Sequence, residues 1–277
     1  MKPSLPLPRL MVAPNGARRG KADHEALPIT LEEIVATAVA CQKAGADGLH
    51  LHVRDKEGRH SLDTGLYREA ITALEHAVPD LFLQVTSEAA GRYSADAQQA
   101  MIRELRPPSV SVALREMLRS RAETSNARAF YAWAHAEGVD VQHIVYSARE
   151  LNWLQECIDQ EVIPGTHHQL QLVLGSYAGS VPPRPCDLDA YLAPLNARRA
   201  DLTFDWMVCA FGSSETACLA HAAALGGKAR VGFENSLWNA DGSLARDNAA
   251  RVAEVRAALD ETASVDETSQ TLSRRAR

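Results

Sequence analysis

Two histidines one residue apart carry the clearest chemical signal in this sequence. His50 and His52 lie in the stretch GLHLHVRD, residues 48–55, where apolar and polar side chains alternate from Leu49 onward. Because the side chains of a strand point to opposite faces with a period of two, the pattern predicts one strand with both imidazoles on one face, about 6–7 Å apart along the chain. Two neutral imidazoles at this spacing can bind one divalent metal ion, usually zinc, if a third ligand comes from elsewhere. The alternative is a histidine pair that only hydrogen-bonds in a polar interior.

The segments that must position these histidines alternate between strand and helix patterns. Thr30 is expected to cap the helix before the histidine strand, with Glu33 completing a capping box and Gly45 ending the helix. Further helices are predicted between the later strands, and the last of them covers residues 245–259. Apart from the histidine strand, the predicted strands cover residues 10–13, 81–86, 109–113, 139–145, 169–174, 202–208 and 229–233.

Eight strand–helix pairs in about 260 residues match the size of a (β/α)₈ TIM barrel. A doubly wound sheet also alternates strands with helices, but the chain has neither a Gly-x-Gly-x-x-Gly motif after the first strand nor a P-loop. The sequence therefore predicts a single-domain α/β TIM barrel over residues 1–260, followed by a polar C-terminal tail over residues 261–277.

In such barrels the active site lies at the carboxyl ends of the strands. Outside the histidine strand, this rule selects the polar residues Asn15, Thr86, Ser87, Glu88, Ser111, Ser176, Glu234 and Asn235. For the residues after the third and fourth strands, capping of a helix or turn is the alternative explanation.

Glu234 is the candidate for the third metal ligand. The last barrel strand closes beside the first, which adjoins the histidine strand, and two histidines with one glutamate form a recurrent catalytic zinc site. Glu234 could instead pair with Arg54. Arg230, four residues earlier, is predicted to point the same way as Glu234, where it would either bind an anionic group of the substrate or form a salt bridge inside the barrel.

The composition is that of an ordinary globular protein, with 46% hydrophobic and 23% charged residues among 277. A formal net charge of −6 and a pI near 5.9 argue against a nucleic-acid or anionic-membrane partner. We find no apolar run long enough to span a membrane and no signal-peptide pattern at the N-terminus. The five cysteines are scattered, without a C-x-x-C motif. These features predict a soluble cytoplasmic enzyme.

The sequence resembles the β-keto acid cleavage enzymes, whose founding activity is the cleavage of 3-keto-5-aminohexanoate. The resemblance extends over nearly the whole chain and rests on the stretches APNGA at residues 13–17, HLHVRD at 50–55, QLVLG at 171–175 and GGKARVGFEN at 226–235. The resemblance implies a TIM barrel with one Zn²⁺ per chain, bound by the residues that match His50, His52 and Glu234. It also implies a retro-Claisen-type exchange, in which a β-keto acid and acetyl-CoA give acetoacetate and a new acyl-CoA. A homo-oligomer, specifically a homotetramer, is implied as well.

The substrate-contacting residues depart from the family pattern. Arg230 matches an arginine of the family's catalytic Arg–Asp pair, but the aspartate that follows the metal-binding glutamate is replaced by Asn235. Because an amide cannot accept a proton as a general base, Glu88 is the candidate for the replacement base. Arg18 stands where the family usually has an acidic residue. The residues expected to contact the substrate, the last three of them through its carboxylate, are Asn15, Thr86, Ser87 and Ser111.

We therefore expect a divergent member that acts on a different β-keto acid. Two alternatives stay open at this point. The first is another metal-dependent C–C lyase or hydrolase reaction on the same barrel without CoA. The second is a non-catalytic metabolite-binding barrel, suggested by Asn235 at the position of the expected base.

Overall fold

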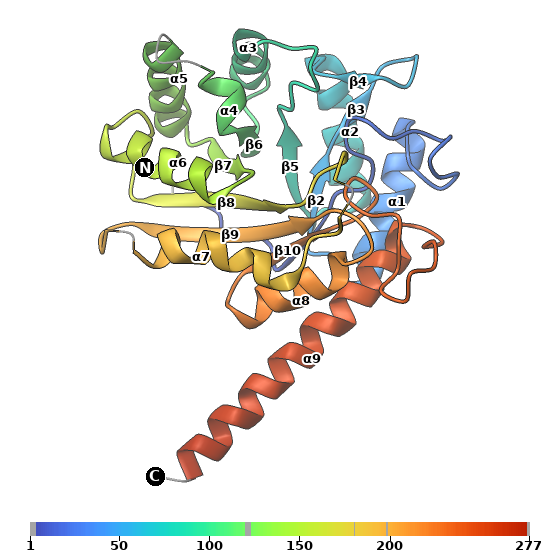
Figure 1. Cartoon of the computed structure of the whole chain (residues 1–277). Coiled ribbons are helices and arrows are strands. Elements are labelled where there is room, and N and C mark those ends of the chain that lie inside the picture. Colours follow the sequence, from blue (N-terminus) through green and yellow to red (C-terminus); the bar gives the residue numbers. More distant parts are fainter. Residues whose placement is uncertain (1–3, 120–122, 180, 198, 276–277) are drawn as a thin grey trace.

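The computed structural model describes residues 4–119, 123–179, 181–197 and 199–275, with side chains described through residue 262. Eight parallel strands form a closed barrel in the order β1-β10-β9-β8-β7-β6-β5-β2, with helices around it (Figure 1). The predicted (β/α)₈ fold is confirmed. The barrel strands are β1 (Leu10–Val12), β2 (Gly48–Leu51), β5 (Phe82–Thr86), β6 (Ser109–Ala113), β7 (Asp140–Val145), β8 (His167–Leu174), β9 (Thr203–Ala210) and β10 (Lys228–Val231).

The helices occupy the connections between these strands, as βα units require. The first begins at Thr30, whose side chain accepts a hydrogen bond from the backbone N–H of Glu33 while the Glu33 side chain completes the capping box, as predicted. The helices are α1 (Leu31–Lys43), α2 (Thr64–Ala77), α3 (Ala95–Leu105), α4 (Leu114–Met117), α5 (Thr124–Glu137), α6 (Ala148–Asp159), a 3₁₀ turn (Pro185–Leu188), α7 (Asp189–Asn196), α8 (Glu215–Ala224) and α9 (Asn248–Arg275).

Alternation along the strands separates an apolar outer layer from a partly polar interior. Leu49 and Leu51 of β2 belong to the main apolar cluster that packs under the helices. His50, between them, instead contacts Gln84 of the neighbouring strand β5 through its ring nitrogen. The interior layer of polar side chains therefore lies directly beneath the carboxyl-terminal mouth of the barrel.

The histidine strand is shorter than the alternation predicts. Pairing of β2 with β5 ends at Leu51, and residues 53–54 form β3 (Val53–Arg54), which pairs antiparallel with β4 (His60–Ser61) in a separate hairpin. The single strand predicted through Arg54 is therefore wrong, because the chain leaves the barrel after Leu51 to pair locally across a turn. His52 lies in this break between the two strands and still reaches His50.

The last helix is longer than predicted. It was expected to end at Leu259 but continues to Arg275, because residues 260–275 contain no glycine or proline to stop it. Most of the predicted polar tail is thus helical, and α9 extends away from the barrel in Figure 1. Residues 276–277 of that tail lie outside the described residues. Within the part of the chain that is described, no helix is both long and apolar enough to cross a bilayer.

Candidate metal centre and active site

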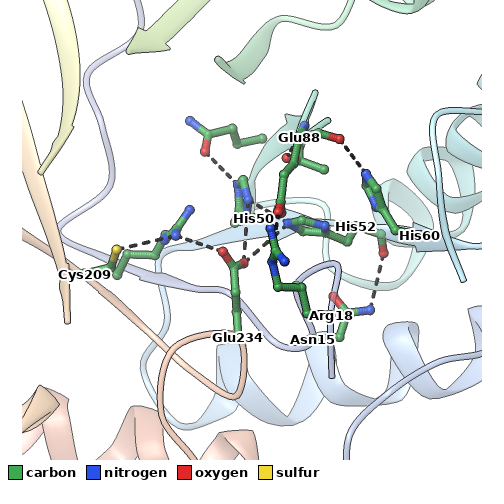
Figure 2. A network of polar contacts seen from close by, with 12 residues as sticks. Asn15, Arg18, His50, His52, His60, Glu88, Cys209 and Glu234 are labelled. Atoms are coloured by element: carbon green, nitrogen blue, oxygen red, sulfur yellow. Dashed lines mark hydrogen bonds and ion pairs between the residues drawn. The ribbon is translucent and has the colours of Figure 1, made fainter. Parts of the chain in front are cut away.

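The three candidate metal ligands converge at the carboxyl ends of β2 and β10. His50 lies within β2, His52 directly follows it, and Glu234 lies in the loop after β10. The Nε2 atoms of the two histidines are 3.1 Å apart, and Oε2 of Glu234 lies 3.8 Å from the His50 Nε2 and 3.4 Å from the His52 Nε2. All three residues are buried. Figure 2 shows their side chains pointing toward one another.

These separations fit a metal ion better than a simple histidine pair. Ligand atoms bound at about 2.0–2.1 Å to a tetrahedral ion lie roughly 3.3–3.4 Å apart. A hydrogen bond between the imidazoles would account for the 3.1 Å contact, but it leaves Oε2 of Glu234 buried without a hydrogen-bond partner among the described residues. Such a carboxylate oxygen is costly to bury. A cation held by the two imidazoles and this oxygen would offset that cost and leave a coordination position open.

The electrostatic environment keeps His50 and Glu234 in the protonation states that bind a metal. Burial lowers the pKa of His50 well below its ordinary value, and the nearby Arg230 lowers it further, so the imidazole is neutral. Burial alone would raise the pKa of Glu234, but Arg230 and the two imidazoles reverse this effect and hold the pKa well below its usual range. Nη2 of Arg230 donates to Oε1 of Glu234 at 3.0 Å. Two neutral imidazoles and one carboxylate are the forms that bind a divalent metal.

The predicted alternative partner of Glu234 has a different role. Arg54 donates hydrogen bonds to backbone carbonyls of the loop after β1, including those of Asn15 and Arg19, and to the Gly58 carbonyl. Its guanidinium thus fixes that loop and the β3–β4 turn. Arg230 is the arginine that pairs with Glu234, and the shared orientation predicted for these two residues is confirmed.

A sharp turn after β10 carries Glu234 to the histidines. Strand β10 ends at Val231, and Gly232 adopts a φ of +135°, where a Cβ atom would lie 2.5 Å from the carbonyl oxygen of Ala13. Only glycine fits this close approach. The backbone N–H of Phe233 donates to Oδ1 of Asn248, and that of Gly232 to Oε1 of Glu215.

Asn248 and Glu215 are positioning residues that the sequence did not reveal. Asn248 also donates to the carbonyl of Pro14, joining the loops after β1 and β10, and Glu215 is paired with buried Arg251 at 2.9 Å. Their types are common at helix starts, and both lie in the first turn of a predicted or observed helix. No sequence signal distinguishes such a residue from an ordinary cap.

Gln84 orients the first histidine ligand. Its Oε1 lies 2.9 Å from Nδ1 of His50, and its Nε2 donates to Oε1 of Gln142 at 3.0 Å. An amide oxygen only accepts, so Nδ1 carries the proton and Nε2 presents its lone pair to the metal site. Gln84 is not among the residues selected from the sequence, although its place two residues before Thr86 puts it in the inward phase of β5.

Loss of this hydrogen bond is expected to weaken metal binding. Gln84→Met keeps the side-chain length but removes the acceptor, so affinity for Zn²⁺ should fall about 10–100-fold, as for other outer-shell partners of metal-bound histidines. Gln171→Met is the matched control, because Gln171 is also buried in the barrel and donates only to backbone carbonyls of Leu172 and Met207. Competition with a chromogenic chelator measures both affinities. Equal loss in the two variants would contradict the assigned role of Gln84.

A cavity of about 440 Å³ opens beside the ligands at the mouth of the barrel. Of the residues selected from the sequence, it is lined by His50, Thr86, Glu88, Ser176, Arg230 and Glu234. Arg18, Arg115, Tyr146 and Tyr177 complete its polar wall. The volume is in the range of small-molecule sites, and five charged side chains face it.

Five residues selected from the sequence are not among those that line the cavity: Asn15, His52, Ser87, Ser111 and Asn235. Asn15 donates to the carbonyls of Pro28 and His52, and Ser87 donates to the carbonyl of Ser111 at 2.9 Å. The Ser111 hydroxyl is buried without a hydrogen-bond partner in the described structure.

Asn235 is fully buried, and both atoms of its side-chain amide also lack a partner within the described ranges. It lies outside the set of residues that line the cavity. The position at which the resemblance places the base is therefore not in the cavity wall.

Glu88 is the carboxylate of the wall that does not pair with Arg230. Its side chain is 21% exposed, 3.8 Å from Nε of Arg18, and its backbone carbonyl contacts Nε2 of His60 at 2.8 Å. Burial raises the pKa of Glu88, although His52 and Arg18 oppose the shift. A carboxylate with a raised pKa is suited to general-base work. Figure 2 shows Glu88 beside the histidine pair.

The comparisons with known proteins agree on one family. The family model described as beta-keto acid cleavage enzyme matches residues 9–272. A 3-keto-5-aminohexanoate cleavage enzyme from Fusobacterium nucleatum is 28% identical over 275 residues, covering 93% of this chain and 94% of the relative. A 3-oxoadipate:acetyl-CoA acetyltransferase from Cupriavidus necator is 26% identical over 257 residues, covering 91% of this chain and 88% of the relative.

Solved structures support the fold. The apo structure of ObcA superposes with a TM-score of 0.65 at 15% identity, covering 83% of this chain and 61% of that one. The 3-hexulose-6-phosphate synthase of Salmonella typhimurium gives a TM-score of 0.59 at 14% identity, covering 92% and 99% of the two chains. At these identities the likeness concerns the barrel alone. The family match over most of the chain is the stronger finding, and the chain belongs to the beta-keto acid cleavage enzyme family.

Proposed function

We propose that this chain is a zinc-dependent enzyme that exchanges the acyl group of a β-keto acid with acetyl-CoA, releasing acetoacetate and a new acyl-CoA. The observation that carries the proposal is the convergence of His50, His52 and Glu234 on one side of a cavity that also holds Arg230 and Glu88. The relatives named for 3-keto-5-aminohexanoate cleavage and for acetyl transfer from acetyl-CoA support the same reaction class.

Zinc bound by the two histidines and Glu234 would act as a Lewis acid toward the β-keto carbonyl. Arg230 contributes a positive charge beside these three residues. Its Nη2 is used by Glu234, but its Nε and Nη1 are buried without partners among the described residues. Unpaired buried N–H groups beside the cavity are suited to stabilising an oxyanion that develops on the substrate.

Glu88 would take a proton from C2, the carbon between the carboxylate and the keto group. The carbanion attacks the carbonyl carbon of acetyl-CoA, and the CoA thiolate leaves. The thiolate then adds to the original keto carbon, the C2–C3 bond breaks, and protonated Glu88 returns its proton to C2. The proton and the CoA group are thus conserved, and the raised pKa of Glu88 favours both transfers.

The substrate carboxylate is assigned to Thr86, and Ser111, which does not line the cavity, is assigned to support Thr86 from the next strand. These residues are register partners on adjacent strands β5 and β6, Thr86 lines the cavity, and the Ser111 hydroxyl has no partner among the described side chains. Ser87, in contrast, holds the two strands together through the Ser111 carbonyl. We assign Asn15 to positioning His52, whose backbone carbonyl it contacts at 3.4 Å.

The proposal is tested by incubating the purified chain with acetyl-CoA and a panel of β-keto acids, with mass-spectrometric detection of acetoacetate and acyl-CoA. We expect both products in equal amounts from at least one substrate, and loss of both after chelation with recovery on adding Zn²⁺. Absence of acyl-CoA across the panel would refute the acyl exchange. Metal binding without stabilisation by acetyl-CoA would favour a metal-dependent reaction without CoA.

The cytoplasm is the expected compartment, because acetyl-CoA is available there and thiols stay reduced. All five cysteines are free in the structure, and four of them are buried. The homo-oligomeric state, a tetramer by resemblance, stays a prediction.

A further inference from the structure

Two arginines of the cavity wall have no role in the reaction proposed above. Arg18 follows β1, and Arg115 is the second residue of α4, which follows β6. Both line the cavity, and both side chains are about half exposed, at 56% and 51%. They approach it from different sides of the barrel, because β1 and β6 are separated by β2 and β5 in the closed sheet.

Neither guanidinium is satisfied by the protein. The nearest carboxylate to Arg18 is Glu88 at 3.8 Å, and the nearest to Arg115 is Glu150 at 3.7 Å. Both distances exceed hydrogen-bond range, and within the described residues neither arginine donates a hydrogen bond that the structure records. Each is held instead over a tyrosine ring, Arg18 at 5.5 Å from the centroid of Tyr177 and Arg115 at 3.4 Å from that of Tyr146. A contact with the face of a tyrosine ring leaves the N–H groups of the guanidinium available to an anion.

The charges of the cavity wall are unequal. It contains three arginines and two glutamates, and Arg230 pairs with Glu234. Arg18 lies nearest Glu88, and Arg115 lies nearest Glu150, which is outside the wall. With Glu150 included these charges balance, and a divalent metal would then leave the site with excess positive charge. The carboxylate common to all β-keto acids is already assigned to Thr86. A second anionic group is therefore needed to use Arg18 and Arg115.

We propose that the preferred substrate is a β-keto dicarboxylic acid, whose distal carboxylate is bound by Arg18 and Arg115. This inference rests on the proposed function and narrows its substrate class. A guanidinium pair recognises a carboxylate by charge-assisted hydrogen bonds and gives little to a neutral alkyl end of the same length. The two arginines are specificity-determining residues of the site.

The test compares substrates of equal chain length, 3-oxoadipate against 3-oxohexanoate, with acetyl-CoA. We expect kcat/KM to favour the dicarboxylate by about tenfold or more, mainly through KM. Arg18→Met and Arg115→Met should each reduce this preference by about tenfold. Arg68→Met is the control, because Arg68 is 53% exposed and pairs with Glu104 on the outer helices. An equal loss for both substrates in either variant, or no loss, would overturn the proposal.

The phosphates of CoA are another anion that these arginines could bind. The assays are therefore repeated with the acetyl thioester of N-acetylcysteamine, which lacks phosphate. The preference for the dicarboxylate should persist with this thioester. Its disappearance would assign the arginines to CoA and overturn the proposal.

A binding measurement separates this inference from the reaction. Calorimetry with glutarate and pentanoate, which have equal chain length and are not turned over, should show tighter binding of glutarate by about tenfold or more, lost in Arg18→Met and Arg115→Met. Glutarate selectivity without turnover of any β-keto acid would refute the acyl exchange but keep the anion site. Turnover of β-keto acids without glutarate selectivity would refute only the dicarboxylate proposal.

Discussion

Replacement of His50 with alanine is expected to remove the bound metal, from about one zinc ion per chain to none. The three ligands come from two separated segments and are preassembled by Gln84, Arg230 and the turn at Gly232. With one imidazole removed, the remaining pair offers two donors, which is too few for a stable protein zinc site. Acyl exchange should fall to the detection limit, because nothing replaces the Lewis acid at the keto group.

Plasma mass spectrometry of tag-free protein measures the metal content, and thermal unfolding measures its effect on stability. Zn²⁺ should raise the thermal unfolding midpoint of the wild-type protein, because a ligand that binds only the folded state stabilises that state. The unfolding midpoint of His50→Ala should not change. His143→Ala is the buried control, because His143 contacts Tyr131 and His168 away from the centre. A His50→Ala protein that still holds about one zinc per chain would contradict the site.

The convergence of His50, His52 and Glu234 was predictable, because each of these residues lies in a segment with a clear local pattern. Alternation places two histidines on one strand phase, and the closed order of the barrel brings the last strand beside the first. The break in the strand after Leu51 was not predictable, because it depends on pairing between β3 and β4 across a turn. The predicted proximity of the two histidines is nevertheless found, because His52 reaches His50 from the break as well.

The supporting residues were not predictable in the same way. Gln84 acts through a neighbouring strand, and Asn248 and Glu215 act through backbone N–H groups of the Glu234 loop. Their roles depend on side-chain packing between segments far apart in the sequence. In a single sequence such residues cannot be distinguished from ordinary strand or capping residues.

The burial of Asn235 bears on which residue acts as the base. Asn235 is fully buried and lies outside the cavity wall, whereas Glu88 lines it. An aspartate at position 235 would bury a charge where the described residues offer the present amide no hydrogen bond. We therefore propose that the base is Glu88, after β5, and not residue 235, where the resemblance would place it.

Glu88→Gln is therefore expected to lower kcat by about 10²–10⁴, because the amide keeps the shape of the side chain but cannot take the proton from C2. Metal content should not change, since Glu88 is not a ligand. Burial raises the pKa of Glu88, and a base works only when deprotonated. In the wild-type enzyme kcat/KM should consequently rise with pH through that pKa, and this limb should vanish in Glu88→Gln.

The control is Glu116→Gln, and the decisive comparison is Asn235→Asp. Glu116 is a neighbouring carboxylate that accepts a hydrogen bond from the backbone of Ala89 at 2.9 Å, and glutamine can still accept it. The kcat of Glu116→Gln should stay within about threefold of that of the wild type. Asn235→Asp added to Glu88→Gln should restore nothing, because position 235 does not face the cavity. Recovery of activity in that double variant would place the base at residue 235 rather than at Glu88.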